Sequence, residues 1–305
     1  MSFETDMIID RRRLKRRLTF WRIVGVLAVV AAVLTALAPF DLSVNKDRIA
    51  RLEVDGIIVD DRLREEALAD IAEDDKVKAL IIAINSPGGT FTGGDSLYQS
   101  LRKVAEKKPV VTVMGGTAAS AGYMIAIAAD YVIASAGTIT GSIGVIMQTA
   151  DVTGLMDKIG IKPVVVKSGH LKAQPNPMEP FSEAARRVTE GIIGDFYDMF
   201  VEIVIERRNL PKSTAYELAD GRIYSGRQAA ANGLIDAIGR ESDAIKWLAA
   251  NHNVDDQLPV IDIKIDYEDE PWRELVGKSL GKALFSERLR LDGVLSLWHP
   301  EGYLD

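Results

Sequence analysis

The chain has 305 residues, 47% of them hydrophobic, which is enough for one large domain or two small ones with a substantial core. It has no cysteine, which excludes disulfides and thiolate nucleophiles, and its three histidines make a histidine-rich metal site a poor explanation of function. The net charge is −7; residues 1–22 hold seven Lys/Arg and three Asp/Glu and so carry +4, which leaves −11 for the rest and argues against nucleic acid as a partner.

The N-terminal residues show the pattern of a membrane anchor. A basic cluster at residues 11–17 precedes an uncharged apolar run at residues 23–40. As a helix this run spans ~27 Å, close to the ~30 Å hydrocarbon core of a bilayer. The basic side is expected to stay cytoplasmic. We therefore predict a cytoplasmic tail over residues 1–22, a transmembrane helix over residues 23–40, and the main domain on the far side of the membrane.

Two other interpretations of this end were weighed. Ala36-Leu37-Ala38 resembles a signal-peptide cleavage site, but Pro39 follows it directly and the apolar run is long for a cleaved signal. Nucleic-acid binding by the basic cluster fits poorly because the apolar run adjoins it.

Alternating strands and helices are predicted downstream. The expected strands cover residues 49–59, 77–84, 109–114, 131–134, 138–147 and 163–166. The expected helices cover residues 62–72, 94–107, 123–129, 151–159, 182–208, 213–220, 225–232 and 242–250. This alternation indicates an α/β fold with right-handed crossovers, in one domain over residues 47–250. A C-terminal extension of uncertain role, residues 251–305, follows it.

The stretch 114–129 predicts a strand, a turn of small residues and a helix, with Ser120 at the start of the helix. Free backbone N–H groups and the positive end of the helix dipole favour anionic oxygen at such a position. We therefore predict that Ser120 is a nucleophile. The alternative is an ordinary N-cap serine, which is far more common.

The strand over residues 77–84 leads into Pro87, Gly88 and Gly89. Proline has no N–H, so Gly88 and Gly89 are the usable donors of this turn. Together with the N–H groups of Ser120 and Ala121 they can stabilise an oxyanion. An ordinary glycine turn is the alternative.

A serine nucleophile also needs a base. His170 is the only histidine in the α/β region, and no pattern links it to an acid. Lysine can serve when desolvation keeps it neutral. Lys172, with apolar or small neighbours, is our candidate, and Lys167 is its competitor. Ser142 lies at a break in a predicted strand, where its hydroxyl could orient a neutral amine or bond the local backbone.

Four motifs occur in order within residues 49–250: INSPGG at 84–89, GTAASAGY at 116–123, TGSIGV at 140–145 and SGHLK at 168–172. This ordered set resembles the signal peptide peptidase SppA family of serine peptidases. The resemblance implies a crotonase/ClpP-like α/β fold of repeated ββα units. It implies a Ser/Lys dyad of Ser120 and Lys172, with Ser142 bonding the lysine amine and an oxyanion hole from Gly88, Gly89 and Ala121.

The resemblance also implies a biological setting. It implies an endopeptidase in the bacterial inner membrane, with its catalytic domain on the periplasmic side and with signal-peptide remnants as substrates. It implies a homo-oligomer in which serine and lysine can come from neighbouring subunits, and no cofactor or metal. Many members carry an acidic residue soon after the lysine, whereas Ala173-Gln174 follow here, a difference we expect to affect loop shape.

Three other functions are alternatives to this one. An acyl-CoA enzyme of the same fold would need carboxylate bases and access to CoA. A non-catalytic membrane scaffold would need only the assembly. A Ser-His-Asp peptidase is disfavoured because the helix after Ser120 contains no histidine.

Overall fold

The computed structural model describes residues 15–30, 46–265 and the backbone of 295–297. The chain divides into two units, Met1–Lys46 and Asp47–Asp305. In the first unit, residues 15–30 form a helix. Among the described residues, none of the helices combines the length and the apolar character needed to cross a bilayer. Residues 31–40 of the predicted span lie outside the described residues, and the transmembrane helix stays a prediction.

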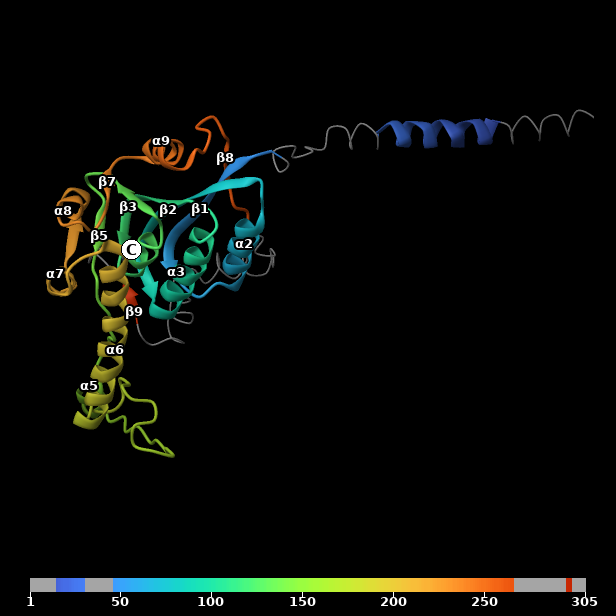
Figure 1. The fold of residues 1–305 in the computed structure, drawn as a ribbon. Helices are drawn as coiled ribbons and strands as arrows, with labels where there is room; N and C mark the ends of the chain where they lie inside the picture. Colours follow the sequence, from blue (N-terminus) through green and yellow to red (C-terminus); the bar gives the residue numbers. More distant parts are fainter. Residues whose placement is uncertain (1–14, 31–45, 266–294, 298–305) are drawn as a thin grey trace, which may run out of the picture. The chain divides into compact units, whose positions relative to one another are not determined.

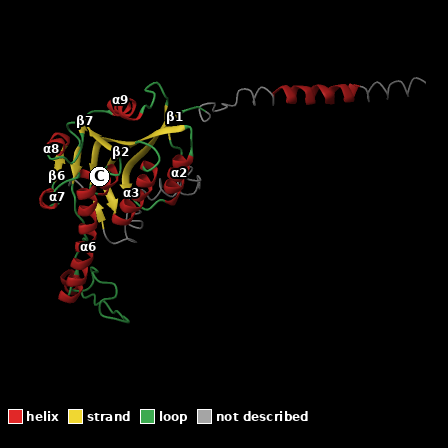
Figure 2. Cartoon of the chain, viewed as in Figure 1, coloured by secondary structure: helices red, strands yellow, loops and turns green. Residues whose placement is uncertain are grey.

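The second unit is built on one sheet, shown in Figures 1 and 2. Its order is β6-β5-β3-β2-β1-β8, with β4 beside β3 and β7, and β9 beside β2. The strands are β1 (Arg48–Ile58), β2 (Val77–Thr90), β3 (Val110–Ala119), β4 (Tyr131–Ala134), β5 (Ile139–Gly141), β6 (Ile223–Ser225), β7 (Ala237–Ile238), β8 (Val260–Asp262) and β9 (Leu295–Leu297). The central strands β1, β2 and β3 pair in parallel.

The helices are α2 (Arg62–Glu73), α3 (Phe91–Ala105), α4 (Ala121–Ala126), α5 (Thr153–Lys158), α6 (Glu183–Arg208), α7 (Lys212–Leu218), α8 (Gly226–Ala231) and α9 (Glu241–His252). Each corresponds to a predicted helix within a few residues at either end. Ser182 caps α6 as expected, since its hydroxyl accepts a hydrogen bond from the Ala185 N–H at 3.2 Å. The mixed α/β class is thus confirmed.

Side chains of the central strands alternate between two cores, because successive residues point to opposite faces of a sheet. Leu80 and Ile82 belong to the larger core, which also takes in buried residues of α2, α3, α4 and α6. Ile81 belongs to the smaller core with Ala244 and Leu248 of α9. Both faces are therefore covered, which explains why β2 begins with a continuous apolar run.

Several strand predictions were wrong in extent. The Gly115-Gly116 pair does not end its strand, since β3 continues to Ala119. Likewise β2 runs through the predicted glycine turn to Thr90. The strand expected over residues 138–147 is limited to β5, because its neighbour β6 pairs with only those three residues. Residues 163–166 form no strand, since no described strand lies beside them to pair with.

The α6 helix and the chain before it project away from the sheet (Figure 1). The C-terminal half of α6 is anchored by the buried residues Phe200, Val201 and Val204. With 26 residues the helix is ~39 Å long, so its N-terminal half reaches well beyond the core. We refer to residues 153–195, which include α5 and the first half of α6, as the arm.

Candidate active site

Ser120 occupies the single residue between β3 and α4. Its backbone has φ 56° and ψ −122°, a conformation that costs an L-residue of order 1–3 kcal/mol. Hydrogen bonds fix it on both sides: its N–H donates to the Gly141 carbonyl at 2.8 Å, and its carbonyl accepts from the N–H groups of Tyr123 and Met124. Strain held in this way at a strand-to-helix turn is the geometry that presents the nucleophilic serine in α/β-hydrolases.

Small residues allow the elements around Ser120 to approach closely. A Cβ at Gly122 would lie 3.0 Å from the Ser86 carbonyl oxygen, and one at Gly94 would lie 2.9 Å from Ala121 Cβ. Because both positions are glycine, β2 and α3 pack directly against the first turn of α4. The position of Ser120 is therefore set by backbone-to-backbone packing.

Strand register brings three predicted site residues together. Ser86 of β2 and Ala118 of β3 form the last pair between these strands, and Gly88 and Ser120 each follow that pair by two residues, with Ser120 just past the end of β3. On the other side, Ala119 pairs with Gly141 of β5, so Ser142 and Ser120 each follow a paired residue. Parallel strands end at the same edge of a sheet, and the predicted turn, nucleophile and supporting hydroxyl therefore converge there.

The predicted oxyanion donors differ in their surroundings. The Ala121 N–H is the first of α4, and the first N–H groups of a helix have no acceptor within it. The Gly88 N–H donates to Ser86 Oγ at 3.1 Å, so an oxyanion would have to replace that hydroxyl as acceptor. A Cβ at Gly89 would lie 1.8 Å from the Ile58 carbonyl oxygen, so only glycine fits beside β1.

Ser142 also has a left-handed backbone, with φ 50°. Its N–H donates to the Arg222 carbonyl at 2.8 Å, and the residue is 8% exposed. The sheet therefore holds a second buried hydroxyl in a fixed backbone conformation beside Ser120.

Lys172 is not brought to this point within one chain. It lies in the loop between α5 and α6, a part of the arm that Figure 1 shows apart from the sheet. The residue is exposed, and its N–H donates to the Gly169 carbonyl at 3.1 Å. The alternative base Lys167 is engaged in an ion pair with Glu179 on the same arm. His170 is exposed in the same loop.

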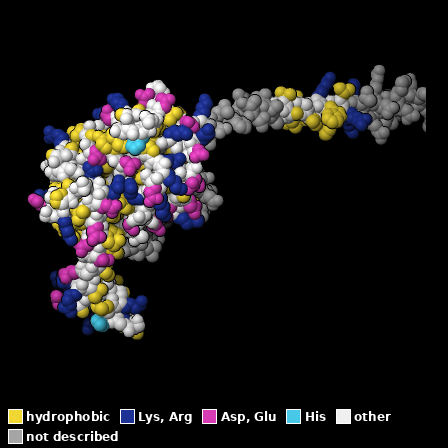
Figure 3. Space-filling view, viewed as in Figure 1, with side chains coloured by type: hydrophobic (Ala, Val, Ile, Leu, Met, Phe, Trp, Pro, Cys, Tyr) yellow, Lys and Arg dark blue, Asp and Glu magenta, His cyan; other side chains and the backbone are white. Residues whose placement is uncertain are grey.

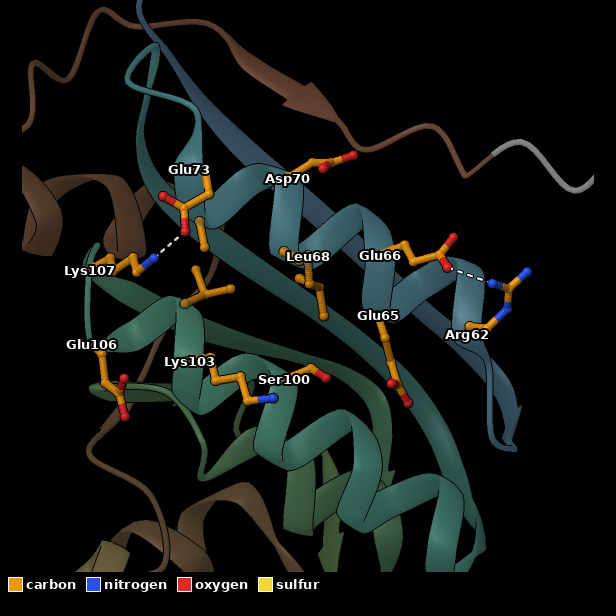
Figure 4. Close-up of a pocket in the computed structure, with 13 residues that line it drawn as sticks. Arg62, Glu65, Glu66, Leu68, Asp70, Glu73, Ser100, Lys103, Glu106 and Lys107 are labelled. Carbon is orange, nitrogen blue, oxygen red and sulfur yellow. Dashed lines mark hydrogen bonds and ion pairs between the residues drawn. The ribbon is translucent and has the colours of Figure 1, made fainter.

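A separate groove of about 590 Å³ lies between α2 and α3 (Figure 4). Two ion pairs lie along it, Arg62 with Glu66 at 2.8 Å and Lys107 with Glu73. It contains none of the predicted site residues. Among the described residues there is also no cluster of three His, Asp or Glu side chains that could hold a metal ion.

Two features of the site had no signal in the sequence. The backbone of β9 pairs antiparallel with Gly88, Gly89 and Thr90, where β2 has lost its neighbour β3. On the arm, Glu179 gathers several polar side chains around the loop that carries Lys172. The β9 pairing and the Glu179 hydrogen bonds both depend on tertiary contacts, which periodic patterns in the sequence do not predict.

The sequence is similar to one peptidase family and to several proteins named as proteases. The profile of peptidase family S49 matches residues 102–255. A Methanocaldococcus jannaschii protein named provisionally as a protease is 36% identical over 228 residues, which are 72% of each chain. An Enterococcus faecium protein named provisionally as signal peptide peptidase SppA is 36% identical over 86% of this chain and 79% of its own length. Protease 4 of Haemophilus influenzae is 33% identical over 72% of this chain and 37% of its own length.

Proposed function

This chain belongs to peptidase family S49, and from that premise we propose that it is a membrane-anchored serine endopeptidase that hydrolyses the remnants of cleaved signal peptides. The observation that carries the proposal is the strained backbone of Ser120 at a point where Gly88 and Ser142 converge. A positive φ at a buried non-glycine residue is maintained only where surrounding contacts enforce it, and such residues cluster at active sites.

The proposed reaction uses Ser120 and Lys172 as a dyad. Neutral Lys172 takes the hydroxyl proton as Ser120 Oγ attacks the peptide carbonyl, and backbone N–H groups stabilise the oxyanion. Lys172 then gives that proton to the leaving amine, which leaves an acyl-enzyme on Ser120. Water, deprotonated by the lysine, attacks the ester, and the lysine returns this proton to Ser120 Oγ as the second product leaves. The Ser142 hydroxyl orients the amine.

An assembly of several copies would bring the two halves of the dyad together. The arm exposes many apolar side chains, with Val164 and Val166 90% and 97% exposed and Leu155 and Ile159 60% and 61%. Figure 3 shows hydrophobic atoms on this projecting part. So many exposed apolar side chains on one projecting segment favour contact with another protein. We propose that the arm packs on a second copy and delivers Lys172 to that copy's Ser120.

The β2 edge offers a place for an extended peptide. Beyond Ser86, β3 turns away to pair with β5, and β9 of the same chain pairs with Gly88, Gly89 and Thr90 instead. A substrate that displaces β9 and adds as a strand at this edge would satisfy its backbone hydrogen bonds there and pass beside Ser120. Signal-peptide remnants, which are short and apolar, suit such a backbone-directed site.

The proposed location rests on the N-terminal sequence. The basic cluster at residues 11–17 would keep that end cytoplasmic, and residues 23–40 would cross the inner membrane. The catalytic unit would then lie on the periplasmic side.

The test is hydrolysis of an Ala- and Leu-rich fluorogenic peptide by the full-length protein in detergent. Ser120→Ala and Lys172→Ala should each abolish turnover, while Lys167→Ala should lower it without abolishing it. Full activity in Lys172→Ala would refute the dyad, and no activity in the wild-type protein would favour the scaffold function.

Co-expression of the two inactive variants tests where the dyad forms. With Ser120 and Lys172 supplied by neighbouring copies in a closed ring, random mixing restores about a quarter of the sites, because each site then draws on two independent subunits. A dyad within one chain would give no recovery.

A further inference from the structure

The loop that carries Lys172 is closed by one carboxylate. Glu179 Oε2 accepts hydrogen bonds from Lys167 Nζ, from Gln174 Nε2 and, at 3.2 Å, from Asn176 Nδ2. The side chains of Lys167 and Glu179 are only 15% and 22% exposed, although they belong to a projecting arm. We call Lys167, Gln174, Asn176 and Glu179 the clasp.

The clasp joins the two ends of the Lys172 loop. Lys167 lies before the loop and the other three members lie after it, so residues 168–173 are held between them. Turns within the loop are fixed by Lys172 N–H to the Gly169 carbonyl at 3.1 Å and by Asn176 Nδ2 to the Ala173 carbonyl at 2.8 Å. Lys172 itself is exposed outside the clasp.

Besides turns within the stretch, the Val152 N–H donates a hydrogen bond to the Pro177 carbonyl at 3.0 Å. Val164 and Val166 are almost fully exposed, and residues 161–182 contain no described helix or strand. Gln174 Oε1 is buried without a hydrogen-bond partner among the described residues, so the orientation of this amide is set by its donation to Glu179. Charge-assisted hydrogen bonds to one carboxylate are about twice as strong as neutral ones, which makes Glu179 the main constraint on the loop.

The clasp also separates the roles of the two lysines. The Lys167 amine is already engaged in an ion pair with Glu179, so it is not presented to a partner outside the loop. Hydrogen bonding from Lys167 in turn lowers the pKa of Glu179, which therefore stays ionised around neutral pH. Glu179 is committed to Lys167, and Lys172 is left available for a partner outside the loop.

We propose that Glu179 is a positioning residue of the peptidase: by closing the clasp it holds the Lys172 loop in the shape that delivers the amine to Ser120. This rests on the proposed Ser/Lys function. Glu179 touches neither substrate nor the reacting atoms, and it acts only through the placement of Lys172.

The test compares Glu179→Gln, Glu179→Asp and a matched control in the full-length protein. Glu183→Gln is the control, because it also removes one arm carboxylate, is 81% exposed and has only a 3.9 Å contact with Arg186. We expect kcat of Glu179→Gln to fall at least ~10-fold, since displacement of a catalytic group by about 1 Å costs up to ~100-fold. KM should stay unchanged because the peptide edge on β2 is untouched, and Glu179→Asp should recover part of kcat.

Recovery of activity on co-expression distinguishes a misplaced Lys172 from a general loss of folding. A Glu179→Gln copy has an intact Ser120, and a Ser120→Ala copy has an intact Lys172 loop, so co-expression of these two variants should raise activity. Co-expression of Glu179→Gln with Lys172→Ala should give no such increase, because neither copy has a correctly placed Lys172. The assembly size and unfolding midpoint of Glu179→Gln should match wild type.

Wild-type kcat in Glu179→Gln, an equal loss in Glu183→Gln, or dissociation of the Glu179→Gln assembly would each overturn the positioning role. These results are separable from failure of the dyad itself, which would appear as activity in Ser120→Ala or Lys172→Ala.

Discussion

The contact between α3 and α4 offers a sharp test of how Ser120 is held. A Cβ at Gly94 of α3 would lie 2.9 Å from Ala121 Cβ, and Met124 Sδ is next at 3.4 Å. Carbon atoms in contact lie about 3.5–4.0 Å apart, so Gly94→Ala must push α4 away by ~0.6–1.1 Å. Ala121 directly follows Ser120, so the nucleophile and a predicted oxyanion donor move together.

We expect Gly94→Ala to lower kcat/KM by ~100-fold, the cost of misplacing catalytic groups by about 1 Å. Stability should change much less. Overpacking costs ~1–3 kcal/mol, and replacing glycine by alanine in a helix returns up to ~1 kcal/mol. The assays are peptide hydrolysis and thermal unfolding of the full-length protein.

Two controls make the result specific. Gln99→Ala changes an exposed position on the same helix and should leave activity unchanged. Ala121→Gly removes the opposing Cβ but keeps the backbone N–H, so the double variant Gly94→Ala/Ala121→Gly should regain most of the activity. Wild-type activity in Gly94→Ala, or no recovery in the double variant, would refute the idea that this contact positions Ser120.

Three further outcomes are expected. Ser296→Pro removes a backbone donor from β9, which pairs with the β2 edge, and should raise the turnover of short peptides; unchanged turnover would mean that β9 does not compete with substrate. Phe200→Ala should lower the free energy of unfolding by ~3–5 kcal/mol, because Phe200 anchors α6 in the core. Val188→Ala, at a position 50% exposed on the same helix, should change it by no more than ~0.5 kcal/mol, and denaturant titrations measure both. The hydrogen bond from Arg51 lowers the pKa of Asp262 in the folded state. The contribution of Asp262 to folding stability is therefore present above its unfolded pKa of ~3.9 and is lost as the pH falls through the folded value. Asp262→Asn should abolish this small pH dependence in unfolding curves, and an identical pH dependence in the variant would contradict the assignment.

Local chemistry in the sequence was sufficient for much of the fold. The apolar run of β2 predicted a strand buried on both faces, and Ser182 predicted the start of α6, because burial and capping leave local patterns. The sequence could also single out Ser120, since a strand, a small-residue turn and a helix surround it. It misjudged where β2 and β3 end, because the strand neighbours that extend them lie far away in the chain.

Tertiary structure alone decided how the site is put together. The positive φ of Ser120 and its alignment with Gly88 and Ser142 depend on register between strands that are tens of residues apart. The exposed position of Lys172 on the arm could not be inferred from its apolar neighbours, since the sequence does not state whether an apolar surface is covered within one chain or by another copy. The Glu179 clasp likewise depends on a loop folding back on itself, for which no periodic pattern exists.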